Sequence, residues 1–127
     1  MNKEIINTSN APEPIGPYSQ AVKVGGFLFL SGQVALKPGT GDLVTTTITE
    51  ETTQVMKNLE AVLSEAGLNF SHVVKTTIFL KEMSSFGEVN AEYGKYFEKD
   101  FPARETVAVK TLPKDVNVEI SMIAVSS

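Results

Sequence analysis

Two segments that read as β-strands carry apolar side chains toward both of their faces. They are residues 27–30, Phe-Leu-Phe-Leu, and residues 118–125, Val-Glu-Ile-Ser-Met-Ile-Ala-Val. A strand with one face in water alternates apolar and polar residues, so these strands must be covered on both sides. The two helices predicted below can cover only one face of a sheet. We therefore expect a second copy of the chain to cover the other face, although the pattern does not give the number of subunits.

The remaining strands are predicted from β-branched segments and turn residues. Residues 8–17 are proline-rich and read as an extended loop. Two apolar segments joined by Gly25-Gly26 predict a β-hairpin, because both turn positions tolerate a positive φ. Residues 34–48 read as an irregular loop. The predicted strands are residues 18–24, 27–33, 72–80, 105–110 and 117–125.

Two helices are predicted from the spacing of apolar residues. The first spans residues 49–66, with Thr49 as its N-cap and Gly67 as its stop. The second spans residues 85–98, where Ser85 and Glu88 match a capping box. Strands and helices together predict one α+β domain over residues 1–127, a length sufficient to bury a core.

Composition excludes several classes of protein. Apolar residues make up 42% and charged residues 20%, and no apolar run reaches the length of a membrane span. The absence of cysteine excludes disulfides, thiolate catalysis and cysteine-based metal sites, and we expect a cytoplasmic protein. The net charge is −4 and the 11 basic residues are scattered, a pattern that disfavours a nucleic-acid partner.

Common catalytic motifs do not explain this chain. Gly39-Thr40-Gly41 lacks the lysine and serine of a phosphate-binding loop and reads as a turn. His72 is the only histidine, and no nucleophile elbow accompanies it, so we interpret it as an ordinary histidine at a strand edge. Close His or carboxylate ligands for a metal do not cluster in the sequence, and we expect no metal site.

Arg104 and Glu119 are the two charged residues with a possible role in chemistry. Arg104 follows Phe101-Pro102-Ala103 and precedes a strand, so rigid neighbours fix its position. Its guanidinium can bind a carboxylate through two parallel hydrogen bonds, although these residues alone favour a surface salt bridge. Glu119 interrupts an otherwise apolar strand, where it either points outward or lines a cleft at an interface.

Several separated motifs resemble those of one family. The run Pro102-Ala103-Arg104-x-x-Val107-x-Val109-x-x-Leu112-Pro113, followed by Val118-Glu119-Ile120, is similar to the signature of the Rid/YjgF family, the reactive intermediate deaminases. Further landmarks stand at the expected spacing: Gly16-Pro17-Tyr18-Ser19-Gln20, Ser31-Gly32-Gln33, Asn58-Leu59 and Asn90-x-x-Tyr93. The resemblance covers residues 3–125.

This resemblance implies a fold, an assembly and a reaction. The fold is chorismate-mutase-like, a mixed sheet of about six strands with two helices on one face, in a homotrimer with three ligand clefts between subunits. Deaminase members hydrolyse 2-iminopropanoate and 2-iminobutanoate to 2-keto acids and ammonia, and we expect no cofactor. The resemblance implies that Arg104 binds the substrate carboxylate and that Glu119 positions or deprotonates the water. Substrate contacts are implied for Tyr18, Ser31, Gly32, Asn90 and the backbone of Thr106.

Two positions depart from the family pattern. Glu105 stands where relatives carry a small or apolar residue, and an acid there could pair with Arg104 in place of the substrate. Because successive strand residues point to opposite faces, we expect Glu105 to face away. Thr106 replaces a common cysteine. The alternative functions are a regulatory trimer that binds a small keto acid without turnover, a ribonuclease or translation inhibitor, and a chaperone-like protein.

Overall fold

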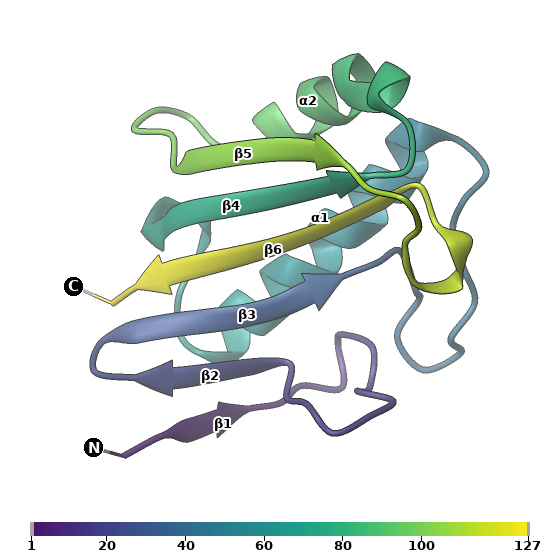
Figure 1. The fold of residues 1–127 in the computed structure, drawn as a ribbon. Helices are drawn as coiled ribbons and strands as arrows, with labels where there is room; N and C mark the ends of the chain where they lie inside the picture. The colour runs from purple at the N-terminus through teal and green to yellow at the C-terminus, as the bar shows by residue number, and fades with distance from the viewer. Residues whose placement is uncertain (1, 127) are drawn as a thin grey trace.

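Six strands form one mixed sheet in the order β1-β2-β3-β6-β4-β5 (Figure 1). The computed structural model describes residues 2–126. All neighbouring strands are antiparallel except β4 and β5, which run parallel. The strands are β1 (Glu4–Ile6), β2 (Ala21–Val24), β3 (Phe27–Gln33), β4 (Val73–Leu80), β5 (Ala103–Ala108) and β6 (Val118–Val125).

Two α-helices, α1 (Ile48–Glu65) and α2 (Phe86–Gly94), lie behind the sheet in Figure 1. The apolar face of α1 is buried as predicted, and it covers the alternate residues of β6 that point toward it. Those residues of β6 are fully buried: Val118, Ile120, Met122 and Ala124. The predicted α+β class, with a mixed sheet of six strands and two helices on one face, is confirmed.

The other face of the sheet is open and largely apolar. Phe27 and Phe29 of β3 stack on each other there, and the two residues are 46% and 43% exposed. Ile123 and Val125 of β6 are only partly buried on the same face. The prediction that these strands are apolar on both sides is therefore confirmed within the described chain.

The predicted N-cap of α1 is wrong, and the predicted N-cap of α2, Ser85, is in place but does not form the capping box. Thr47, not Thr49, caps α1, since the Thr47 hydroxyl accepts the Glu50 N–H at 3.1 Å. The helix starts earlier because Thr47 is extended, as an N-cap residue must be, whereas Thr49 already lies within the helix. Ser85 makes no side-chain cap bond to α2, because its backbone is already in a helical conformation at the end of the short 3₁₀ turn Met83–Ser85. The second helix also ends at Gly94, four residues before the predicted end.

Strand boundaries differ from the prediction mostly at their starts. Gly25 and Gly26 adopt φ values of 57° and 84° in the β2–β3 turn, which confirms the hairpin. The three-residue strand β1 was not predicted, and it pairs with β2. Arg104 lies inside β5 rather than just before it. Neither helix in the described part of the chain is long and apolar enough to cross a membrane.

Candidate functional site

Arg104 projects from the edge strand β5 against α2. Its Nη1 donates to Asn90 Oδ1 at 2.8 Å. The guanidinium carbon lies 5.1 Å from the ring centroid of Tyr93 and 5.6 Å from that of Phe86, within the range of a cation–π contact. The Tyr93 hydroxyl in turn donates to Thr76 Oγ1 at 2.9 Å, which seats the ring on the sheet. Three side chains of helix α2 therefore fix the position of the guanidinium: the rings of Phe86 and Tyr93 and the amide of Asn90.

The space in front of Arg104 is an open cavity of about 530 Å³, called the Arg104 cavity below. Within residues 2–126, no carboxylate forms an ion pair with the guanidinium. The surface salt bridge that the sequence left open is therefore not found in the described chain. A guanidinium carries five N–H donors, so most of them are available to a ligand. The cavity is lined by Asn90, Tyr93, Gly94, Phe101, Pro102 and Arg104.

Glu105 points away from Arg104, as predicted. Its carboxylate accepts a hydrogen bond from Thr77 Oγ1 at 2.8 Å and pairs with Lys75 Nζ at 3.2 Å. The Thr77 hydrogen bond and the Lys75 ammonium lower the pKa of the Glu105 carboxyl. These contacts lie on the face of the sheet opposite to α2, so Glu105 does not compete for the Arg104 guanidinium.

Glu119 lies in a second cavity, of about 390 Å³, called the Glu119 cavity below. Its carboxylate is half-buried, and it has no hydrogen-bond partner among residues 2–126. Burial raises the pKa of this carboxyl above its ordinary value. The cavity is lined by Pro12, Glu13, Ile15, Tyr18, Gln20, Ser31, Gly32, Gln33, Val34, Leu36, Pro113, Lys114 and Glu119.

Gly32 lies directly beneath the Glu119 carboxylate. A Cβ atom added to Gly32 would overlap Glu119 Oε2 and lie 3.0 Å from the carboxyl carbon. Only glycine lets the β3 backbone approach the carboxylate this closely. Gly32, which the resemblance associates with substrate, thus also makes room for Glu119.

Buried amide side chains hold the walls of the Glu119 cavity. Gln20 Oε1 accepts the Thr8 N–H at 2.7 Å, and its Nε2 donates to the carbonyls of Thr8 and Pro12 at 3.0 and 2.9 Å. Asn58 Nδ2 donates to the carbonyls of Val34 and Leu36 at 3.1 and 2.9 Å. Both residues belong to the motifs that resemble the family, but their buried partners lie more than seven residues away in the chain and are not predictable from a local pattern.

Arg104 and Glu119 lie on opposite faces of the sheet. Arg104 is in register with Thr76 on β4, and Glu119 is in register with Phe79 on the same strand. Because positions 76 and 79 of an uninterrupted strand point to opposite faces, the two charged side chains do not meet within one chain. Apart from Thr106, which lines neither cavity, the predicted site residues therefore fall into two groups, one in each cavity.

The remaining predicted residues follow this division. Tyr18, Ser31 and Gly32 line the Glu119 cavity, and Asn90 lines the Arg104 cavity. Thr106 lies two residues beyond Arg104 and on the same face, in register with the buried Ile78. Its buried Oγ1 has no hydrogen-bond partner among the described residues.

His72 and the acidic residues form no metal centre in the described chain. His72 ends the 3₁₀ turn Phe70–His72, and its Nδ1 accepts the Asn69 N–H at 3.1 Å. It therefore caps a turn, and the predicted strand-edge placement is off by one residue. Among residues 2–126, no three His, Cys, Asp or Glu side chains lie close enough to hold a metal ion.

Comparison with known proteins identifies the family. The family model described as endoribonuclease L-PSP matches residues 8–126. The mouse protein named 2-iminobutanoate/2-iminopropanoate deaminase is 47% identical, and the match covers 97% of this chain and 91% of the mouse protein. Two relatives from Pyrococcus horikoshii and Pyrococcus abyssi, 49% and 48% identical, carry only the name RutC family protein.

Solved structures agree with this assignment. The crystal structure of YyfA from Yersinia pestis, a protein of the Rid family, is 49% identical, covers 98% of this chain and 99% of its own, and superposes with a TM-score of 0.95. TdcF from E. coli, solved with bound serine, is 36% identical with a TM-score of 0.93 and covers 98% of this chain and 99% of its own. This chain is thus a member of the Rid/YjgF family.

Proposed function

We propose that this protein hydrolyses small 2-imino acids, 2-iminopropanoate and 2-iminobutanoate, to 2-keto acids and ammonia. The observation that carries the proposal is the Arg104 guanidinium, which is backed by aromatic rings, bonded to Asn90 and unpaired with any carboxylate among residues 2–126. The deaminase name of the mouse relative supports it. A rigid guanidinium at an open cavity suits the planar carboxylate of a small acid.

We further propose that the complete site forms between subunits of a homotrimer. One chain presents Arg104 at the edge strand β5 and Glu119 on the opposite face. The exposed apolar residues of that face, among them Phe27 and Phe29, need cover that residues 2–126 do not provide. A head-to-tail ring would place the Glu119 cavity of one subunit against the Arg104 cavity of the next.

The chemistry needs orientation, a positioned water and proton transfer. Arg104 holds the substrate carboxylate and thereby fixes the C=N carbon, while the Thr106 carbonyl accepts the imine N–H. The imine reacts in its protonated form, C=NH₂⁺: ionised Glu119 takes a proton from water as the water oxygen bonds to that carbon and the C=N π electrons move to nitrogen, which gives a neutral carbinolamine. Glu119 then gives this proton to the carbinolamine nitrogen, the C–N bond breaks with release of ammonia, and the hydroxyl proton passes to Glu119, leaving the 2-keto acid. The raised pKa of Glu119 suits it to return the proton that it accepted.

A coupled assay tests the proposal. A threonine dehydratase generates the imine, and the lifetime of the imine is followed with and without the purified protein. We expect the wild type to shorten that lifetime, and we expect Arg104→Ala to lower kcat/KM about 10²-fold because a bidentate, charge-assisted pair is lost. Arg104→Lys is the matched control, since it keeps the charge but not the paired geometry. An unchanged imine lifetime with the wild-type protein would refute the deaminase proposal.

A regulatory trimer that binds a small acid is the second candidate. The solved structure of TdcF holds bound serine, which shows that this relative binds a small amino acid. Glu105 does not favour this candidate over the deaminase, because it faces away from Arg104. Calorimetric binding of 2-ketobutyrate without imine hydrolysis would select it.

Ribonuclease activity that survives both Arg104→Ala and Glu119→Gln would point to a contaminant, and suppression of client aggregation by both variants would point to chaperone-like action elsewhere on the surface.

A further inference from the structure

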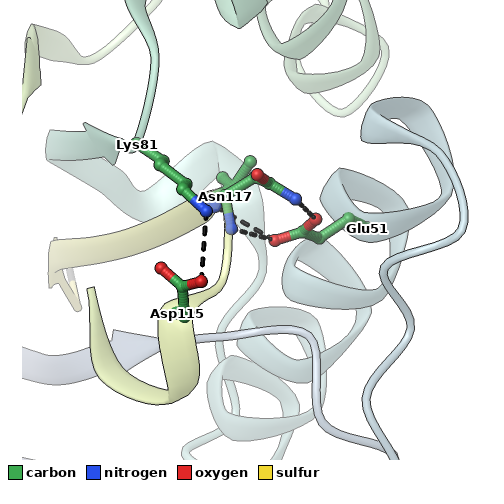
Figure 2. Close-up of polar contacts among 5 residues, drawn as sticks. Glu51, Lys81, Asp115 and Asn117 are labelled. Carbon is green, nitrogen blue, oxygen red and sulfur yellow. Dashed lines mark hydrogen bonds and ion pairs between the residues drawn. The ribbon is translucent and has the colours of Figure 1, made fainter. Parts of the chain in front are cut away.

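Glu51 is a fully buried carboxylate on the first turn of α1. Its Oε2 accepts the backbone N–H groups of Asn117 and Val118 at 2.8 and 3.0 Å, and its Oε1 accepts Asn117 Nδ2 at 2.8 Å (Figure 2). No basic side chain among residues 2–126 pairs with it, since the nearby Lys81 bonds Asp115 instead. Three donors from one short segment therefore satisfy a carboxylate that has no counter-charge.

Burial of a carboxylate costs free energy that a residue with only a packing role would not require. A buried carboxylate loses its hydration, and an apolar side chain of similar size would pack at this place without that loss. What the carboxylate supplies is direction, because it fixes two consecutive backbone amides at the start of β6. The carbonyl of Asn117 is fixed from the other side by the Lys81 N–H at 3.0 Å.

The residue immediately after these two amides is Glu119. The Glu119 side chain has no hydrogen-bond partner of its own among the described residues, so its place depends on the backbone that carries it and on the space above Gly32. The segment before the two amides also lines the Glu119 cavity, through Pro113 and Lys114. Lys114 and its neighbour Asp115 have φ values of 56° and 55°, a conformation that non-glycine residues adopt only when their surroundings hold them.

We propose that Glu51 is a positioning residue for the reaction: by holding the amides of Asn117 and Val118, it sets the direction of Glu119 and the position of the Pro113–Asp115 turn. The proposal rests on the proposed function of Glu119. Glu51 does not line the Glu119 cavity, so it acts through the backbone and not on the substrate.

The polarity of the contact provides a sharp test. Glu51→Ala removes the acceptor for three donors. Asn117→Asp places a second carboxylate against Glu51 and removes the Nδ2 donor. Adding Glu51→Gln to Asn117→Asp restores the contact with reversed polarity, because the glutamine oxygen accepts the two backbone amides and its NH₂ donates to the aspartate. Glu50→Ala, one residue earlier and exposed, is the matched control.

We expect Glu51→Ala and Asn117→Asp to lower kcat at least about tenfold at temperatures where each variant is folded, because a small misplacement of a catalytic group is costly. KM should stay within about twofold, since Arg104 is untouched. The double variant should recover most of the lost kcat, and Glu50→Ala should match the wild type. A merely structural role would lower the melting temperature and leave kcat of the folded protein unchanged.

A second readout does not depend on turnover. The ¹³C chemical shift of the Glu119 carboxyl, followed against pH, reports its surroundings directly. We expect its titration to move toward the ordinary range in Glu51→Ala and Asn117→Asp and to return in the double variant. Were the wild type to lack deaminase activity, the proposed function would fail while this measurement still tested the positioning. Folded single variants with an unchanged Glu119 titration would overturn the inference, and if Glu51→Ala does not fold, Asn117→Asp and its rescue decide it.

Discussion

The carboxylate of Glu119 and the backbone of Gly32 occupy adjoining space so tightly that the two residues have to be considered together. Glu119 is half-buried and has no partner in residues 2–126, and Gly32 makes room for one of its oxygens. A residue with these properties is poised for chemistry, because neither its charge nor its hydrogen-bonding capacity is used for stability.

Gly32→Ala should therefore damage activity more than stability. The added Cβ would overlap Glu119 Oε2 and push the carboxylate out of place. We expect kcat to fall at least about tenfold, with the melting temperature changed by only a few degrees. Gly87→Ala is the control, since a Cβ there meets nothing within 4 Å. A Gly32→Ala protein with wild-type kcat would show that the carboxylate tolerates displacement.

The pH dependence of the reaction should report the same carboxyl. Glu119 must be ionised to accept a proton from water, and burial raises its pKa above the ordinary value of 4.5. Activity should accordingly decline as the pH falls through that raised pKa, and the decline should begin above pH 4.5. The measurement is kcat/KM against pH for the wild type and for Glu119→Gln, which should lose this acid limb along with most of its rate. Glu13 lines the same cavity, and Glu13→Gln should keep the limb.

For single residues, the sequence predicts which face of a strand a side chain points to, but not which residues it contacts. Alternation along a strand predicted that Glu105 faces away from Arg104, and the contacts of Glu105 with Thr77 and Lys75 confirm it. The cation–π contacts of Arg104 could not be predicted, because they depend on how α2 packs against β5. Buried polar residues such as Glu51 find partners 66 residues away, a distance over which a local pattern carries no signal.

Helix α2 contributes both to the stability of the fold and to the wall of the Arg104 cavity. Tyr93 donates to the buried Thr76 of β4 and lies under the guanidinium of Arg104, while Glu92 accepts from Thr53 of α1 at 2.9 Å. Helix α2 is thus fastened both to the sheet and to α1, and its position fixes Asn90 and the aromatic floor beneath Arg104.

Tyr93→Phe should remove the hydrogen bond to Thr76 but keep the aromatic ring next to Arg104. The lost hydroxyl leaves Thr76 Oγ1 unsatisfied in a buried place, so we expect the free energy of unfolding to fall by about 1–2 kcal/mol. The phenylalanine ring still supports the guanidinium, and kcat/KM should change less than about threefold. Urea unfolding at fixed protein concentration measures the loss. The double variant Tyr93→Phe/Thr76→Val should lose less than the sum of the two single variants, whereas strictly additive losses would contradict the contact.

Elements with strong local signals were predictable and those that depend on neighbours were not. The helix over α1 and the Gly25-Gly26 hairpin follow from apolar spacing and turn chemistry, and both are confirmed. The strand β1 has only three residues and is recognisable only by its pairing with β2. The N-cap of α1 was misplaced because Thr47 and Thr49 both fit the pattern, and only the backbone conformation distinguishes them.

At the scale of the whole molecule, the register of β4 separates the two charged residues. Arg104 pairs with position 76 and Glu119 with position 79, so the sheet itself lies between them. This separation depends on long-range strand pairing, which the sequence does not reveal. In the proposed trimer, a neighbour that covers the open apolar face would bring its own Arg104 to Glu119.

Mixing two inactive variants tests the shared site. Arg104→Ala chains retain Glu119, and Glu119→Gln chains retain Arg104, so each homotrimer should be inactive. If each site takes one residue from each of two neighbours in a ring, refolding the variants together in equal amounts should restore about one quarter of the wild-type sites, by random assortment of subunits. Simple mixing without subunit exchange should restore none, which serves as the control. The coupled imine assay measures the activity, and size-exclusion chromatography with light scattering verifies the trimer. An inactive mixture of well-formed mixed trimers would place both residues in a site within one chain, an arrangement that the register of β4 opposes.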